Sequence, residues 1–407
     1  MITEFGQIPS HWKISSIKEE TELVTDYVAN GSFASLKENV TYSSIPDYAV
    51  IIRLTDFNNQ FKGPFVYVSK SAYEFLKKSK LNGGEIIISN VGAYTGTVFR
   101  TPKLSIPKTL GPNSIMVNFK GSNDFYEYWF KSKFGQFMIQ GIISGSAQPK
   151  FNKTSFRSLS IPVPPLEEQK AIAEVLSSLD DKIELLQKQN ETLEALAQTL
   201  FRQWFIEEAE DSWKEVELHE LVDLQGGYAF KSSSYADHGD YTVITIKSVQ
   251  DGYLDTQSAN HIDVLPEKLK PYQLLEHGDV LLSLTGNVGR VCLVDQENCV
   301  LNQRVAKIKA KNELYGPWSY FFFRQPCMIS QLTALSKGTA QLNLSPVETG
   351  KIIVKNPDNR VLEKFNNIVS PMLQKVLLNK HSIHSIIETR DTILPKLMSG
   401  QVRVKLD

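Results

Sequence analysis

The residues of this chain that could do chemistry are few, and their spacing does not suit catalysis. Gly350-Lys351 has no glycine upstream at the distance that a phosphate-cradling loop requires, so ATP hydrolysis is unsupported. No Gly-x-Gly-x-x-Gly stretch follows an apolar strand, so a dinucleotide or a methyl-donor cofactor has no obvious backbone cradle. His381 and His384 lack a nearby Cys or acidic ligand set, which predicts solvated positions on a helix rather than a metal site.

One short motif partly matches a motif of DNA-modifying enzymes. Asn356-Pro-Asp-Asn is similar to an amino-methyltransferase motif, but that motif also needs a second proline and an aromatic ring to stack a flipped base. The matching segment in the other half is Pro164-Pro165-Leu166, and we interpret both as turns that enter a helix. The chain is therefore expected to bind rather than to catalyse. The alternative is a self-contained DNA methyltransferase or nuclease with an unrecognised site, which cofactor binding by the isolated chain would reveal.

Polar side chains gather instead in two glycine loops and two later segments. The loops are Gly92-Ala-Tyr-Thr-Gly96 and Gly286-Asn-Val-Gly289, and the segments read "SGSAQPKFN" (144–152) and "KGTAQLNLS" (337–345). Donors and acceptors on such tips are what base reading requires. If the chain reads DNA, the candidate contacts are Asn90, Tyr94, Thr95, Gln148, Lys150, Asn152, Lys153, Thr285, Asn287, Arg290, Lys337, Gln341 and Asn343. The alternative for each is an ordinary turn or capping role.

The charge is balanced overall and uneven locally. The formal net charge is −1, but residues 100–157 hold nine Lys or Arg against two acids, and residues 304–351 hold seven against two. Solvated loops alone could produce such stretches. Because they recur at matching places, we expect them to supply phosphate contacts, with Lys150 and Lys153 among them.

The chain repeats itself at a spacing of about 194 residues. "GEIIIS" at Gly84 aligns with "GDVLLS" at Gly278, and the aromatic segment that begins at Phe125 aligns with the one at Trp318. Each half would be a mixed domain of about 150 residues followed by one long helix. The predicted fold class is therefore α+β, with two repeated mixed α/β domains separated by two long antiparallel coiled-coil helices.

Apolar residues at steps of three and four predict those helices. One seam runs through Ile172, Leu176, Leu179, Ile183, Leu186, Asn190, Leu193, Ala197, Leu200 and Trp204. The other runs through Leu362, Phe365, Val369, Met372, Val376, Asn379, Ile383, Ile386, Arg390, Ile393 and Leu397. Pairing within the chain would place Asn190 against Asn379 and fix the register, and Pro371 predicts a kink or a late helix start. The alternative is a coiled coil between two chains.

Composition limits the class of protein. A chain of 407 residues predicts two or more domains, and 42% hydrophobic residues without a long apolar run predict no membrane span. The start of the sequence lacks a basic region followed by an apolar core, so a cytoplasmic location is expected. Cys292, Cys299 and Cys327 form no Cys-x-x-Cys pair and are predicted to be buried free thiols.

Three segments carry a resemblance to a known family. "IPVPPLEEQKAIAEVLSSLDDKIELLQKQNETL" from Ile161, "ETRDTILPKLMSGQVRV" from Glu388 and the early "GQIPSHWK" resemble specificity subunits of type I restriction-modification systems. The likeness covers essentially the whole chain. "NPDNRVLEKFNNIVSPML" departs from it, because the Glu-Glu-Gln of the first helix entry is missing there.

The resemblance implies an architecture and partners. It implies two recognition domains that each read half of a split double-stranded DNA target, here residues 1–155 and 209–350, with conserved helical regions at 156–208 and 351–407. It implies no chemistry in this chain: two modification subunits would bind S-adenosylmethionine and methylate adenine, and restriction subunits would cut DNA with ATP and Mg. A coiled-coil spacer between two protein-binding domains is a further alternative, which predicts no salt-dependent DNA binding.

Overall fold

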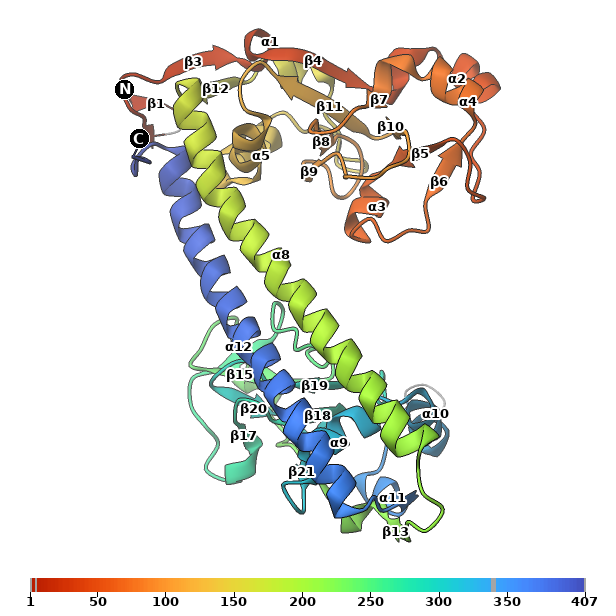
Figure 1. Ribbon diagram of the computed structural model, residues 1–407. Coiled ribbons are helices and arrows are strands. Elements are labelled where there is room, and N and C mark those ends of the chain that lie inside the picture. The colour runs from red at the N-terminus through yellow and green to blue at the C-terminus, as the bar shows by residue number, and fades with distance from the viewer. Residues whose placement is uncertain (1, 4–5, 338–341, 406–407) are drawn as a thin grey trace. The chain divides into compact units, whose positions relative to one another are not determined.

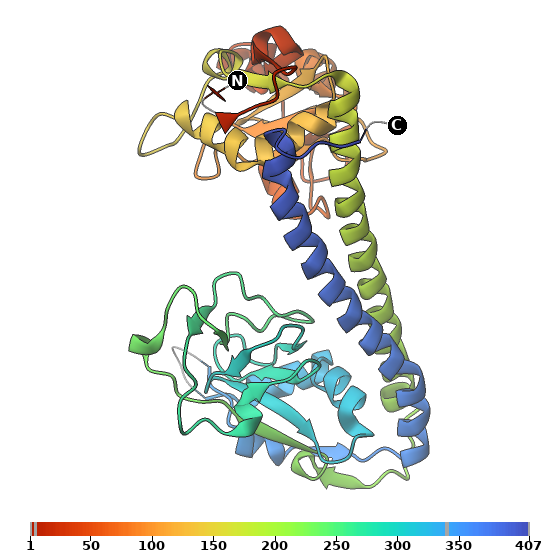
Figure 2. The same cartoon turned by 90° about the vertical axis from the view of Figure 1, so that its left-hand side faces the viewer.

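The computed structural model describes residues 2–3, 6–337 and 342–405. Two compact units make up the chain: the first unit contains Met1–Asp181 and Ile386–Asp407, and the second unit contains Lys182–Ser385. The first unit thus combines residues from the early and the late parts of the chain (Figures 1 and 2). Each of the two long helices contributes residues to both units.

Two four-stranded sheets form the core of the first unit. One has the order β4-β11-β8-β9 and is antiparallel; the other has the order β6-β5-β10-β7, with β5 and β10 parallel. Two-stranded ribbons pair β1 with β2 and β3 with β12. The strands are β1 (Ile2–Thr3), β2 (Gly6–Gln7), β3 (Lys13–Ser16), β4 (Thr21–Asp26), β5 (Ala49–Ile52), β6 (Val66–Val68), β7 (Lys80–Leu81), β8 (Ile86–Ser89), β9 (Val98–Arg100), β10 (Lys108–Leu110), β11 (Ser114–Phe119) and β12 (Ser160–Val163).

Short helices complete the first unit. They are α1 (Ile17–Glu20), η1 (Tyr27–Asn30), α2 (Phe33–Asn39), α3 (Leu54–Asn58), α4 (Lys70–Phe75), η2 (Lys77–Ser79), α5 (Asn123–Lys131), α6 (Lys133–Gly141) and α7 (Lys153–Arg157). α5 begins where the Ser122 hydroxyl accepts a hydrogen bond from Phe125 N. Its aromatic face buries Phe125, Trp129 and Phe130 in the same core as Ile88 of β8, which anchors the sheet that carries the first glycine loop.

The second unit repeats this topology. One sheet has the order β14-β21-β18-β19, the other has β16-β15-β20-β17 with β15 and β20 parallel, and β13 pairs with β22. The strands are β13 (Glu215–Glu217), β14 (Val222–Gly226), β15 (Tyr241–Ile244), β16 (Asn260–Ile262), β17 (Leu274–Leu275), β18 (Val280–Ser283), β19 (Val291–Leu293), β20 (Cys299–Leu301), β21 (Val305–Ala310) and β22 (Ile353–Lys355). Since strand order and parallel pair match those of the first unit, the predicted internal repeat is confirmed.

The helices of the second unit are again mostly short. They are η3 (Gln203–Glu207, a π-helical turn), η4 (Leu218–Glu220), η5 (Ser232–Ser234), η6 (Pro271–Gln273), α9 (Tyr315–Phe323), α10 (Pro326–Leu335) and α11 (Pro346–Gly350). α9 corresponds to α5, and it buries Trp318, Tyr320 and Phe321.

The two long helices are α8 (Leu166–Arg202) and α12 (Asn359–Met398), which lie side by side in both views (Figures 1 and 2). In the second unit, Asn190 hydrogen-bonds Asn379, and the Phe201 and Phe365 rings lie 6.0 Å apart. Residues later in α8 thus contact residues earlier in α12. The helices are therefore antiparallel and pair within one chain, as the seams predicted.

Two expectations are wrong in part. α12 begins at Asn359 and stays helical through Pro371, so there is no late start. Pro371 has no backbone N–H to donate, but Phe365 and Val369 before it and Leu373 and Val376 after it are buried, and such tertiary packing supplies most helix stability.

The second partial error concerns the thiols. Cys292 of β19 and Cys299 of β20 are buried in one apolar core, but Cys327, in the first turn of α10, is exposed. Within the part of the chain that the structure describes, no helix is long and apolar enough to cross a bilayer.

Candidate nucleic-acid interface

The first glycine loop joins β8 to β9, and backbone hydrogen bonds close it. Gly96 N donates to Ser89 O at 2.8 Å, and Ser89 N donates to Thr97 O at 2.9 Å. Gly92 and Gly96 have φ of 107° and 100°, a region that glycine enters without steric cost. The base of the loop is therefore fixed, while Tyr94 at its tip is 67% exposed.

A second turn, from Ser144 to Lys150, lies beside this loop. These two residues exchange backbone hydrogen bonds of 2.9 Å each, and Gly92 N donates to Pro149 O at 2.9 Å. The structure thus joins two predicted contact segments, distant in sequence, into one loop-and-turn surface.

The second unit builds the same loop-and-turn surface. Lys337 and Asn343 exchange backbone hydrogen bonds of 3.1 and 2.9 Å, and Gly286 N donates to Leu342 O at 3.0 Å. These contacts occupy the equivalent positions of the repeat. The duplication therefore extends to the hydrogen bonds that hold each surface together.

Two predicted contact residues in the first unit use their side chains to hydrogen-bond the backbone of the loop-and-turn surface. The Asn90 side-chain amide donates to Phe151 O at 3.2 Å. Thr95 is buried, and its hydroxyl lies 2.6 Å from Gly92 O and 3.0 Å from Pro149 O. Their side chains therefore stabilise the loop that carries Tyr94.

Two further predicted residues have local partners. Asn152 is the N-cap of α7, and its Oδ1 accepts a hydrogen bond from Ser155 N at 2.8 Å. Lys153 Nζ forms a 2.8 Å ion pair with Asp26 Oδ1, which neutralises part of its charge. The capping alternative thus applies to Asn152.

In the second unit, two of the predicted side chains bond each other. The buried Thr285 hydroxyl donates to Asn343 Oδ1 at 2.8 Å. Arg290 is half-buried, and its Nη1 donates to Gln250 Oε1. Gln250 was not among the residues that the sequence singled out.

The remaining predicted contacts point to solvent. Tyr94, Gln148 and Lys150 are exposed in the first unit, and Asn287 and Lys337 are exposed in the second. Gln341 lies outside the described residues. Each surface therefore presents polar and cationic side chains on a hydrogen-bonded base, which is the arrangement that contact with DNA bases and phosphates requires.

Comparison with known families decides what kind of protein carries these surfaces. The model of the type I restriction modification DNA specificity domain matches residues 9–195 and 210–358. The chain belongs to the type I restriction-modification DNA specificity family. The resemblance seen in the sequence is confirmed, and with it the expectation of a specificity subunit that is not itself an enzyme.

Relatives of this specificity family match most of the chain. The type I restriction enzyme MjaIX specificity subunit of Methanocaldococcus jannaschii is 25% identical over 441 residues, covering 99% of this chain and 96% of the relative. The HindI specificity subunit of Haemophilus influenzae is 26% identical, covering 69% and 75%. The S subunit structure from M. genitalium has a TM-score of 0.59 at 18% identity, covering 98% and 97%, which supports the fold.

One cation beside the second loop was not named individually from the sequence. Arg304 is exposed, and its backbone carbonyl accepts a 3.0 Å hydrogen bond from Leu284 N at the start of the second loop. The signal was present, because Arg304 opens the basic stretch 304–351.

A group of lysines and tyrosines in the first unit was not singled out from the sequence either, and in it Lys80 Nζ pairs with Glu74 Oε2 at 2.9 Å. Lys80 Nζ lies 4.3 Å from the centre of the Tyr73 ring, and Lys70 Nζ lies 5.8 Å from that of Tyr48. Residues 62–80 hold five lysines against one acid, a count that would have revealed the group. Such mixtures suit nucleic-acid backbones and bases.

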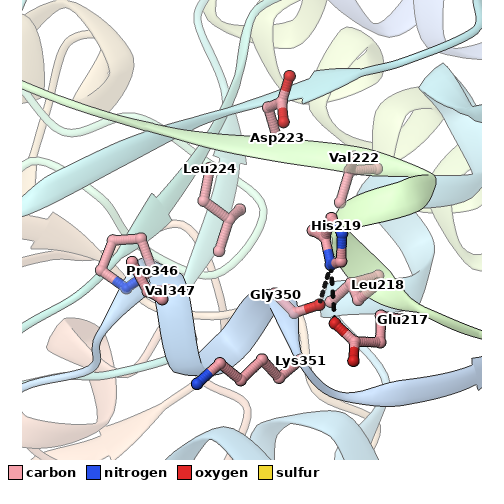
Figure 3. A pocket seen from close by; sticks show the side chains of 10 residues that line it. All are labelled: Glu217, Leu218, His219, Val222, Asp223, Leu224, Pro346, Val347, Gly350 and Lys351. Atoms are coloured by element: carbon pink, nitrogen blue, oxygen red, sulfur yellow. Dashed lines mark hydrogen bonds and ion pairs between the residues drawn. The ribbon is translucent and has the colours of Figure 1, made fainter.

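A pocket of about 400 Å³ lies in the second unit between β14 and α11 (Figure 3). His219 Nδ1 lies 3.0 Å from Glu217 Oε2 and 3.3 Å from Gly350 O. Val222 and Leu224 give the pocket an apolar wall, and none of the predicted DNA contacts lines it. Among the described residues, no cluster of His, Cys, Asp or Glu is arranged to hold a metal ion.

Proposed function

We propose that this chain is the DNA-reading subunit of a type I restriction-modification complex, in which each unit reads one half of a bipartite target. The loop-and-turn surface, present once in each unit, is the observation that carries the proposal. Its exposed amides and lysines supply donors, acceptors and positive charge. One reader per unit accounts for a target in two halves.

The recognition domains would comprise residues 1–155 and 209–350, and the helical regions residues 156–208 and 351–407. The family match in two blocks, 9–195 and 210–358, supports a division into two similar parts. In this assignment α8 and α12 set the spacing of the half-sites. At ~1.5 Å per residue, the 37 residues of α8 make a rod of roughly 55 Å.

The same helices would dock two modification subunits. Residues 156–208 hold ten acids against five bases, and Glu184 and Glu191 lie on the exposed side of α8, away from the buried seam. An acidic helical face of this kind attracts a basic partner and steers its association.

The chemistry would belong to the partners. The modification subunits would supply S-adenosylmethionine for methyl transfer to adenine, and the restriction subunits would use ATP and Mg to cut DNA. The residues of this chain would bind the duplex and hold it in register, because phosphate contacts position a protein and base contacts specify the sequence.

Co-purification with modification subunits tests this function. The complex should methylate adenine within one bipartite sequence, and sequencing of methylated adenines in strains with and without the gene should show that motif appear and vanish together with the chain. The purified chain alone should transfer no methyl group. Methyl transfer by the isolated chain, or methylation without sequence preference, would contradict the proposal.

A further inference from the structure

Arg290 occupies the end of the second glycine loop, where the loop enters β19. Its backbone is fixed, because Ser283 N donates to Arg290 O at 2.9 Å. Its guanidinium is held as well, because Nη1 donates to Gln250 Oε1. A long side chain that is usually free to rotate is thus oriented before any ligand arrives.

The amide of Gln250 is itself fixed in orientation. Its Nε2 donates to Lys247 O at 2.7 Å, and its backbone N donates to Tyr253 O at 3.1 Å. Because the amide nitrogen of Gln250 donates to Lys247 O, the amide oxygen faces Arg290. A flipped amide would place its N–H donors against the N–H donors of Arg290. Gln250 is therefore a positioning residue for the guanidinium.

The turn that carries Gln250 is anchored at three points within the second unit. Gly252 N donates to Val291 O of β19 at 2.8 Å, and Lys380 of α12 donates to Gly252 O at 3.1 Å. Asp251 accepts a 3.0 Å hydrogen bond from Arg324 Nε. The position of Gln250 thus depends on the edge strand and on the long helix, and not on its own loop alone.

We propose that Arg290, held by Gln250, reads a guanine in the half-site that the second unit recognises. A guanidinium has five N–H donors, and the contact with Gln250 uses one, which leaves enough to bond guanine O6 and N7 together. Such a bidentate contact needs a fixed guanidinium plane, whereas a phosphate contact tolerates a mobile side chain. This inference rests on the proposed function and names one base within its target.

The first unit offers a matched position without this chemistry. Thr97 N-terminal to β9 corresponds to Arg290, because its carbonyl accepts a 2.9 Å hydrogen bond from Ser89 N as that of Arg290 does from Ser283 N. The Thr97 hydroxyl donates to Tyr94 O at 2.9 Å. Arg290→Thr therefore installs a side chain that the fold already accepts at this place, and Thr97→Ala is the control in the other half.

The test measures binding of the complete chain, assembled with its modification subunits, to DNA duplexes that vary one base pair of the target at a time. For the unaltered complex, replacing one particular G·C pair in one half-site should weaken binding about 5- to 150-fold. In Arg290→Thr that discrimination should vanish at this pair alone and persist elsewhere. Thr97→Ala should leave it unchanged.

Gln250 provides the second readout. Gln250→Leu removes the acceptor for Arg290 and should reduce discrimination at the same pair. Gln250→Glu keeps an oxygen acceptor for Arg290 and should retain that discrimination. Retained discrimination at all other pairs shows that each variant is folded. The inference is overturned if Arg290→Thr removes discrimination at no G·C pair of either half-site. It is also overturned if Arg290→Thr weakens binding to every duplex equally, as loss of a phosphate contact would. An unaltered complex without sequence preference would instead contradict the proposed function itself.

Discussion

The side-chain amide of Asn379 donates a 2.8 Å hydrogen bond to Asn190 Oδ1 in the buried seam between α12 and α8. Asn190 in turn donates to Val376 O at 3.4 Å, and both asparagines are at least nine-tenths buried. Any shift of one helix along the other would leave these amides unpaired among apolar side chains. The pair therefore selects one register of the antiparallel helices.

Replacing one member of this pair should destabilise the protein. Asn379→Leu leaves the buried Asn190 Oδ1 without its donor, which costs about 1–3 kcal/mol in the free energy of unfolding. The double variant Asn190→Leu/Asn379→Leu should recover most of that loss. Chemical denaturation of the single and double variants measures the coupling, and additive losses would show that the two amides act independently.

A buried carboxylate should hold the two ends of the first unit together. Glu168 Oε2 accepts a 3.1 Å hydrogen bond from Trp12 Nε1, and its Oε1 lies 3.4 Å from Arg403 Nε. Glu168→Ala leaves the buried indole N–H unpaired and should lower the free energy of unfolding by about 1–3 kcal/mol. Glu167→Ala, at a side chain that is 71% exposed, is the control and should change stability little. Equal effects of the two substitutions would refute the assignment.

Two lysines of the first unit that were predicted to contact DNA should behave differently. Lys150 is exposed, whereas Lys153 is paired with Asp26 at 2.8 Å. Lys150→Ala should weaken binding to all duplexes and reduce the slope of log affinity against log salt by about one. Lys153→Ala should change that slope less, because its charge is already compensated. Binding titrations at several salt concentrations measure these slopes. An unchanged slope in Lys150→Ala would show that the DNA surface lies elsewhere.

The three thiols should differ in reactivity. Burial raises the pKa of Cys292 and of Cys299 to about 12 each, so at pH 8 both thiols are protonated and unreactive. Cys327 is exposed. Alkylation of the native protein followed by mass spectrometry should label Cys327 alone, with Cys292 and Cys299 reacting only after denaturation. Rapid native labelling of Cys292 would contradict the burial.

Periodicity predicted the long helices and the asparagine pair, because a seam at steps of three and four is a local pattern that burial imposes directly. The strands were harder to predict. β5, β8 and β20 are buried on both faces, so their sequences show no alternation from which sheet order could be derived. The repeat predicted only that both halves share one topology, and it left the strand order of each sheet open.

The candidate interface was predictable as a region and not as a set of contacts. The repeat identified the glycine loops and polar turns, and the structure joins them. Which side chains reach solvent depends on packing across the unit. The residue types alone therefore did not show that Thr95 and Thr285 are buried while Tyr94 is exposed. The bond between Gln250 and Arg290 links two loops with no shared pattern, and only the three-dimensional fold brings them together.

The central claim is that each unit reads its own half of the DNA target. Exchange of residues 1–155 for the equivalent residues of a relative with a different target, followed by sequencing of methylated adenines in cells that carry the modification subunits, tests it most directly. One half of the methylated motif should change, while the other half and the gap between them stay as they were. A motif altered in both halves, or methylation that does not follow the exchange at all, would contradict the account.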